Sequence, residues 1–481
     1  MAKSLRKNSL FNILYNTASV LFPFITSIYT SRVLQSDGIG KVAYGQNLAS
    51  YFVIFAVLGL PTYGVREIAK IEKNQDDINK VFTELIIINA LFTTIATFFY
   101  VLLILCVPKF KSDFKLFFSC GLQIVLNYLN IDWFYQGKEE YIYISIRSII
   151  VKTVSFFMVL LIVKRHDDYI LYALISSLAL SANYIFNIIH ARKYVKITLA
   201  GLNFKRHYKS LIILAVSYFL SAAYSKIDIT MLGSMSTESA TGIYNNAHKI
   251  IDMAIVVCSS ISSVFLPRLS YYYKYNRSQF LALIEMGIRI LSFISFPVTI
   301  EIFIVAPQIM RILYGESFAA GALTIRIFSL LILVKSFGNL LCYQLVIATE
   351  NEKKRLLPFL FAAIFNIIFN AILIPRMAQN GAAIASVVSE LIVNVLQFIA
   401  IHKLLSIKLS AKPIIEAVTT SVVMGIAGLL ISRLFDCYLL QLGSSAILGV
   451  AIYFLLNYII RNETLINILN IAKRSIRRLN I

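Results

Sequence analysis

Charged residues interrupt the long apolar runs of this chain. The basic ones that are candidates for binding are Arg147, Lys152, Lys226, Lys249, Arg326 and Lys335. A cation costs about 2.5–3.5 kcal/mol at the centre of a membrane span, so it usually faces a cavity or a partner. We therefore expect them to line a central, positively charged cavity that matches an anionic head group. The alternative is that each extends to an interface or forms a structural pair, which we favour for Arg326 because it lies near the end of its run.

Acidic residues also occur inside the apolar runs. Asp228, Asp252 and Glu390 are candidates to bind a coupling ion, either H⁺ or Na⁺. A local salt bridge with Lys226 or Lys249 is the alternative, and Asp252 suits it because it lies three residues after Lys249 on the same helix face. Glu390 has no basic neighbour in its own predicted helix, so it is the better coupling candidate.

No motif for covalent, metal or nucleotide chemistry accompanies these charges. The sequence contains no GxxxxGK[ST], GxSxG or HExxH pattern. Its five cysteines are scattered without CxxC spacing, and its five histidines form no cluster. We therefore assign the histidines no role, and we expect no metal site, no cofactor other than a coupling ion, and no enzymatic activity.

The composition is that of a polytopic membrane protein. The 481 residues are 58% hydrophobic and only 14% charged, with a mean hydropathy of +0.76, whereas a soluble protein has roughly a quarter charged residues. Apolar runs of about 20 residues, long enough to cross a bilayer, recur throughout. We predict an all-α fold with about 14 transmembrane helices, over residues 10–33, 41–64, 81–107, 114–135, 141–163, 169–190, 209–232, 242–266, 281–305, 320–348, 356–374, 381–401, 413–432 and 443–460.

The basic residues outside these runs predict the orientation. With the N-terminus inside, most of them fall in cytoplasmic segments such as 66–80, 192–209 and 461–478, as the positive-inside rule requires. We predict that both termini are cytoplasmic. Most of the net charge of +21 is thus a topology signal and not evidence for a nucleic-acid partner.

Two segment types occur twice. Residues 37–61 and 238–267 share a turn, a glycine, then Tyr44 or Tyr244, and an apolar helix ending in Leu-Pro. A charged hairpin follows an apolar run near 136–140 and again near 349–354. Such duplication is typical of transporters. We predict two six-helix lobes, 1–200 and 201–405, with two further helices and a basic tail over 406–481. The first hairpin carries Trp133, the only tryptophan, which we expect at the membrane interface.

Segments 31–70 (SRVLQSDGIGKVAYGQNLASYFVIFAVLGLPTYGVREIAK) and 132–163 (DWFYQGKEEYIYISIRSIIVKTVSFFMVLLIV) resemble the bacterial polysaccharide flippases. These proteins are the O-antigen or capsule repeat-unit translocases of the multidrug/oligosaccharidyl-lipid/polysaccharide (MOP) superfamily. The resemblance implies a MATE-like fold in the bacterial cytoplasmic membrane. It also implies alternating access, coupled to H⁺ or Na⁺, that moves an undecaprenyl-pyrophosphate-linked oligosaccharide from the cytoplasmic to the outer leaflet. Partners would be this lipid-linked oligosaccharide, membrane lipids, and polysaccharide polymerase and chain-length proteins.

The resulting hypothesis is a flippase in which Arg147, Lys152, Lys249 and Lys335 hold the pyrophosphate. A lipid II flippase of the same superfamily remains open as an alternative. A multidrug cation antiporter would need an acidic or apolar cavity, which the surplus of in-span bases opposes. A membrane polysaccharide polymerase would need a large outward loop, and the predicted outward connections are short.

Overall fold

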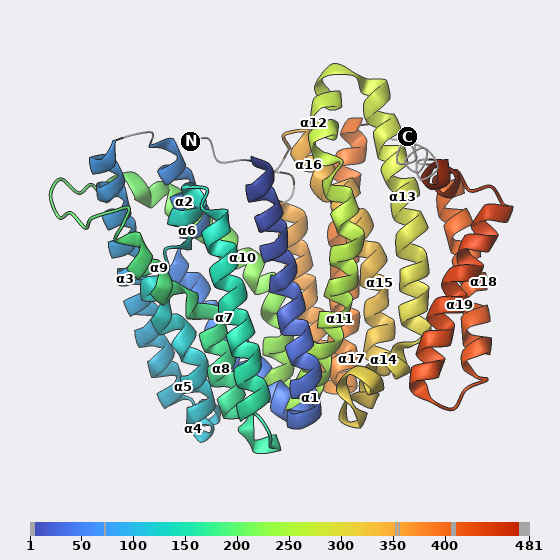
Figure 1. Ribbon diagram of the computed structural model, residues 1–481, viewed down its shortest axis with the longest axis horizontal. Helices are drawn as coiled ribbons and strands as arrows, with labels where there is room; N and C mark the ends of the chain where they lie inside the picture. Colours follow the sequence, from blue (N-terminus) through green and yellow to red (C-terminus); the bar gives the residue numbers. More distant parts are fainter. Residues whose placement is uncertain (1–4, 72–73, 352–353, 355, 406–409, 471–481) are drawn as a thin grey trace, which may run out of the picture. The chain divides into compact units, whose positions relative to one another are not determined.

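Helices make up the regular secondary structure in the part of the chain that the computed structural model describes, residues 5–71, 74–351, 354, 356–405 and 410–470 (Figure 1). The predicted all-α class is therefore confirmed. The chain divides into two compact units, residues 1–242 and 243–481. The predicted lobes 1–200 and 201–405, and the appendix 406–481, stay a prediction, and the end of the basic tail, 471–481, lies outside the described residues.

In its described residues, the first unit has ten α-helices and two short 3-10 turns. These are α1 (Leu5–Val57), α2 (Leu60–Lys70), α3 (Gln75–Cys106), α4 (Pro108–Ser112), α5 (Phe114–Val125), η1 (Leu126–Leu129), α6 (Asp132–Gly137), α7 (Tyr141–Ile162), η2 (His166–Asp168), α8 (Tyr169–Ser181), α9 (Asn183–Ala191) and α10 (Lys205–Met235).

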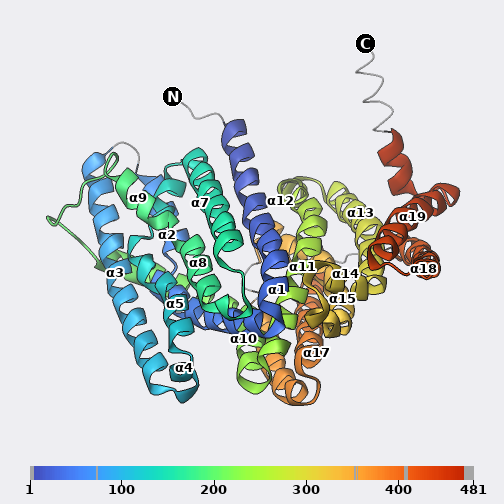
Figure 2. The same ribbon diagram turned by 60° about the horizontal axis from the view of Figure 1, so that its bottom comes forward.

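The second unit continues with helices through to the end of the described chain. These are α11 (Glu238–Ser263), most of which lies in this unit, α12 (Leu266–Tyr275), α13 (Arg277–Ile304), α14 (Ala306–Tyr314), η3 (Glu316–Gly321), α15 (Ala322–Gly338), the π-helical η4 (Asn339–Gln344), α16 (Leu345–Ala348), α17 (Leu356–Leu405), α18 (Lys412–Ser432) and α19 (Tyr438–Ile459). The last two, α18 and α19, lie side by side in the red part of the ribbon (Figure 2).

Nine helical stretches of the described residues are long and apolar enough to span a membrane, or ten if the bent α10 is one span. The lower count than the 14 predicted spans has a structural cause. The predicted spans 10–33 and 41–64 lie on either side of a backbone break at Gln35, and together they count as one stretch. The predicted spans 356–374 and 381–401 lie on either side of a break at Ala378 and also count as one. Predicted span 114–135 falls on shorter helices. Most of predicted span 242–266 falls on α11, which is not among the nine stretches. The multi-span prediction is confirmed.

The two predicted hairpins end their first helices in the same way. Glu139 and Glu350 both have positive φ, at 56° and 58°. In the first hairpin the Glu139 and Glu140 N–H groups donate to Gln136 and Tyr135 carbonyls, and the second hairpin repeats these bonds one for one. This is the Schellman arrangement, in which the left-handed residue satisfies carbonyls that the helix leaves open. The repeated hairpin seen in sequence therefore has a repeated backbone geometry.

The two segments that carry the family resemblance pack on each other. α2 and α6 lie side by side in the first unit (Figure 1). Trp133 covers Gly64, where an added Cβ would lie 2.6 Å from the indole ring. A Cβ added at Gly137 would likewise lie 2.8 Å from the Ile68 Cβ. Trp133 is only 3% exposed, so its indole packs inside the protein, and its predicted place at the membrane interface stays a prediction. The glycine on the neighbouring helix makes room for it in the core.

Candidate functional site

Arg147 is held by a carboxylate from the other arm of its hairpin. Its guanidinium lies 3.0 Å from Asp132 Oδ1, and Asn187 of α9 donates to the same oxygen at 2.5 Å. The Arg147 guanidinium also lies over the Tyr143 ring, 5.5 Å from its centre. With 7% of its surface exposed, Arg147 needs this pairing because a buried cation alone is strongly unfavourable. The pair has no net charge.

A groove of about 420 Å³ lies between α7 and α9 beside this pair. Its walls are apolar side chains of the two helices, and Arg147, His190 and Lys193 also line it. His190 stacks on Tyr143 with ring centres 4.1 Å apart. The groove therefore combines an apolar surface with basic groups, a combination that suits a lipid chain ending in an anionic group.

The other two predicted cations of the first unit contact different partners. Lys152 is partly buried in α7, and its ammonium donates to Ser19 Oγ of α1 at 2.6 Å. Lys226 is partly buried in α10, where its backbone carbonyl accepts a bond from Asn47 at 3.0 Å. Asp228 is buried two residues later. The first unit thus distributes its candidate charges over separate helix contacts.

The second unit brings two of its candidates, Asp252 and Lys335, close together. Lys249 and Asp252 are on α11, and Lys335 on α15 is close enough to interact electrostatically with the Asp252 carboxylate. Asp252 Oδ2 lies 2.8 Å from His248 Nδ1, one helical turn earlier. The His248 ring in turn packs edge-on against Phe328, with ring centres 5.3 Å apart. The expected local partner of Asp252 was Lys249; the structure gives it His248 and Lys335.

Arg326 and Glu390 lie elsewhere in the second unit. The Arg326 guanidinium donates to the Phe303 carbonyl at 3.2 Å and lies over the Phe303 ring, which joins α15 to α13. These contacts hold the Arg326 side chain against α13, and its predicted extension to a membrane interface stays a prediction. Glu390 is partly buried in α17, after the break at Ala378.

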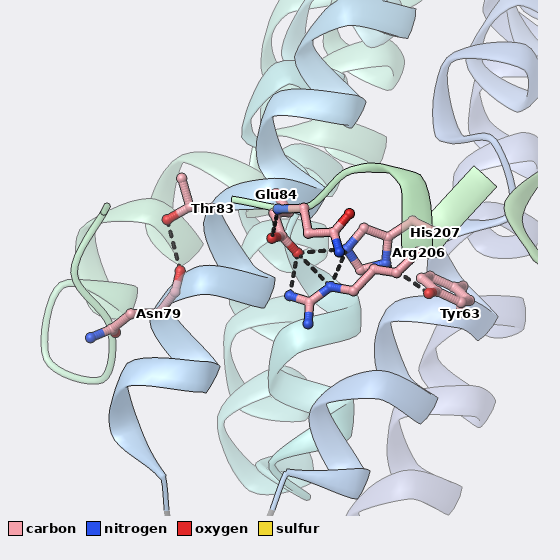
Figure 3. Close-up of polar contacts among 7 residues, drawn as sticks. Tyr63, Asn79, Thr83, Glu84, Arg206 and His207 are labelled. Carbon is pink, nitrogen blue, oxygen red and sulfur yellow. Dashed lines mark hydrogen bonds and ion pairs between the residues drawn. The ribbon is translucent and has the colours of Figure 1, made fainter. Parts of the chain in front are cut away.

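One buried polar cluster was missed by the sequence analysis. The Glu84 carboxylate of α3 is fully buried and meets His207, which is 1% exposed, and Arg206 from the start of α10 (Figure 3). Glu84 Oε2 lies 2.7 Å from His207 Nε2, and His207 Nδ1 lies 2.7 Å from the Tyr63 hydroxyl. Glu84 lies within the predicted span 81–107, and an acidic residue inside a span could have marked it as a candidate. His207 lies just outside the predicted span 209–232, so its position did not mark it.

Several known proteins are similar to this chain. A family model described as "Polysaccharide biosynthesis protein" matches residues 5–273. A relative from Escherichia coli (strain K12), named for O-antigen transport, is 25% identical over 411 residues, 84% of this chain and 98% of its own. A relative from Haloferax volcanii, named as a flippase of low-salt glycan biosynthesis, is 23% identical over 202 residues, 42% of this chain and 43% of its own.

Two solved structures share the fold. The lipid II flippase MurJ, in an inward closed conformation, has a TM-score of 0.76 at 15% identity and covers 95% of this chain and 99% of its own. An inward-facing multidrug resistance MATE family transporter of the MOP superfamily has a TM-score of 0.58 at 15% identity, covering 81% and 98%. The predicted MATE-like fold is confirmed. Because the family model matches more than half of the chain, this multi-pass membrane protein belongs to the polysaccharide biosynthesis family of O-antigen and glycan transporters.

Proposed function

We propose that the protein flips an undecaprenyl-pyrophosphate-linked oligosaccharide from the cytoplasmic to the outer leaflet by alternating access. The observation that carries this proposal is the family match over residues 5–273, together with a relative named for O-antigen transport that aligns over nearly its whole length. A membrane transporter of this kind needs no catalytic group. The lipid tail stays in the bilayer while the pyrophosphate and sugars cross.

The second unit supplies the best support for an anionic cargo. Lys249 of α11 and Lys335 of α15 are both partly buried, and Asp252, which interacts with Lys335, is also bonded to His248. These residues of the two helices are therefore two lysines and one acid, and the acid already has a partner. In our proposal these two lysines bind the pyrophosphate. A secondary part in cargo binding falls to Arg147, Lys152, Lys226 and Arg326. The side chains of Arg147, Lys152 and Arg326 already bond to other groups of the protein.

A cation gradient drives the cycle in this proposal. Glu390, Asp228 and Asp252 are the candidates for the H⁺ or Na⁺ site, and Glu390 and Asp228 lie in helices that are long and apolar. In this proposal both termini lie in the cytoplasm, and the polysaccharide polymerase and chain-length proteins are partners in the bacterial cytoplasmic membrane. Collapsing the proton and sodium gradients separately in vesicles would identify the ion.

A lipid II flippase is the second candidate. The fold similarity to MurJ covers nearly the whole chain, and lipid II also carries a pyrophosphate, so the two lysines suit both cargoes. A multidrug antiporter fits less well because its cargo is often cationic. A polymerase fits least, since family relatives are named for transport.

Complementation tests the proposal. Lys249→Ala combined with Lys335→Ala removes two charged contacts, each worth about 1.5–3 kcal/mol, so surface polysaccharide in a cell lacking its own flippase should fall at least about tenfold. Lys412→Ala is the control, because that exposed lysine pairs with Glu416 at the start of α18. Full activity of the double variant at equal expression would refute the cationic cargo site. If the wild-type protein restored lipid II transport and not surface polysaccharide, the second candidate would be favoured.

A further inference from the structure

Hydrogen-bond geometry limits where protons can lie in the Glu84 cluster. The 2.7 Å contact between Glu84 Oε2 and His207 Nε2 is too short for two lone pairs, so one proton must lie between them. The same holds for His207 Nδ1 and the Tyr63 oxygen, also 2.7 Å apart. A neutral histidine satisfies both contacts when Tyr63 donates. A doubly protonated histidine satisfies them equally, with Tyr63 accepting. Glu84, His207 and Tyr63 can therefore hold one additional proton without moving their heavy atoms.

Arg206 approaches the same carboxylate oxygen. Its Nε donates to Glu84 Oε2 at 3.0 Å, and a terminal nitrogen contacts that oxygen as well. Arg206 Nε lies only 3.4 Å from His207 Nε2. Because Nε2 carries the proton between it and Glu84, two N–H groups already face each other across this short distance when the histidine is neutral. A second proton on His207 would bring two cations to one carboxylate, so arginine and a charged histidine compete as its partner.

The two competitors differ in exposure. Glu84 and His207 are buried, but the Arg206 side chain is 44% exposed. A buried carboxylate needs one cationic partner, and two partners leave an unfavourable net charge. Arg206 can move into solvent, whereas His207 cannot. Among the residues that the structure describes, Arg66 and Glu67 of α2 are further charged groups that act on Tyr63.

We propose that Glu84 and His207 form a proton-binding site in which a proton taken up by His207 replaces the Arg206 guanidinium as the cationic partner of Glu84. In the first state Glu84 pairs with Arg206 and His207 is neutral. In the second state a proton from solvent resides on His207, and Arg206 extends into water. The buried charge is balanced in both. The proton site deepens the coupling part of the proposed function. Only the role of this site in transport rests on the proposed function.

The site controls the attachment of the segment that connects α9 to α10. α3 binds this segment through side chains one turn apart: Gln75 donates to the Tyr194 carbonyl, and Asn79 accepts from the Lys196 N–H. Thr83 continues the series with the Thr198 N–H at 3.1 Å.

Glu84 makes the last of these attachments. Its Oε1 accepts the Asn203 N–H at 2.6 Å while Oε2 meets Arg206 and His207. Exchange of the cation at Oε2 therefore acts directly on the point where the connecting segment enters α10.

Histidine nitrogen NMR of the full-length protein in lipid nanodiscs tests the site without any transport. The chain has only five histidines, so ¹⁵N-histidine labelling gives a readable spectrum, and His207→Asn identifies the signal. If that variant does not fold, Tyr63→Phe identifies it instead, because Tyr63 is the partner of Nδ1. Between pH 8 and pH 5, the His207 signal should change from the singly to the doubly protonated form.

Arg206→Gln provides the decisive comparison. Removing the competing cation should move the midpoint of that change to higher pH, because the charged histidine then has no second cation beside it. Arg192→Gln is the matched control, since Arg192 is exposed in the same connecting segment and should leave the midpoint in place. A His207 signal that never changes, or equal midpoints in the two variants, would overturn the proposal. Failure of the wild-type protein to restore surface polysaccharide would instead count against the flippase function and leave the proton site standing.

Discussion

Gly64→Ala tests the contact between the two segments that carry the family resemblance. A methyl group at Gly64 would lie 2.6 Å from two carbons of the Trp133 indole. Trp133 is buried and packs on Phe82 at 5.9 Å between ring centres, so it has little room to move. Overpacking of this kind costs about 1–3 kcal/mol. The helix propensity of alanine offsets up to about 1 kcal/mol of that cost.

Taking a net cost of about 1–2 kcal/mol, we expect the variant to lower the melting temperature by about 2–8 °C, using about 2–4 °C per kcal/mol for a unit of this size. A thiol-reactive dye can report unfolding, because Cys120, Cys258 and Cys342 are buried. Gly443→Ala is the matched control: Gly443 lies inside α19 with no atom within 4 Å of its added Cβ, so this change should be neutral or stabilising.

Trp133→Phe separates the clash from other effects of the alanine. Phenylalanine lacks the fused ring that the new methyl group would meet, so it should recover part of the stability of Gly64→Ala. An unchanged melting temperature in Gly64→Ala, or no recovery in the double variant, would refute the packing argument.

Two other predictions concern ion pairs. Arg147→Met should lower the free energy of unfolding by about 2 kcal/mol, because Asp132 loses a charged hydrogen bond. Adding Asp132→Asn should recover part of that loss in a double-mutant cycle. Purely additive losses would contradict the pairing. At the exposed end of the second unit, Lys274 lowers the pKa of Glu350, so the pair stabilises the fold above the ordinary carboxyl pKa and this contribution disappears as the pH falls. Thermal unfolding of Glu350→Gln should therefore differ slightly from wild type at pH 7 and not at pH 3, and a difference that grows on acidification would contradict this sign.

Local patterns predicted the architecture well because membrane spans and turns are local features. Length and apolarity predicted an all-helical membrane protein, and the repeated hairpins have matching backbone geometry at Glu139 and Glu350. The breaks at Gln35 and Ala378 could not be predicted, since both are non-glycine residues with positive φ, a conformation that sequence rarely marks.

Contacts between distant residues explain what the sequence did not predict at the site. Glu84 and His207 are 123 positions apart, and His207 appeared to lie merely at the edge of a span. The burial of Trp133 depends on Gly64 of another helix, which makes space for the indole and lies 69 positions earlier in the chain. Arg147 was expected to be a free cavity charge, but Asp132, 15 positions earlier, folds back across the hairpin to pair with it.

The most direct test is a flipping assay with purified protein in liposomes. Undecaprenyl-pyrophosphate-linked oligosaccharide placed in the leaflet that matches the cytoplasmic side should become accessible to an added lectin only when the protein is present and a cation gradient is imposed. The Lys249→Ala and Lys335→Ala double variant should lose this activity, while Lys412→Ala should keep it. Oligosaccharide that stays inaccessible with folded wild-type protein under both proton and sodium gradients would contradict the account.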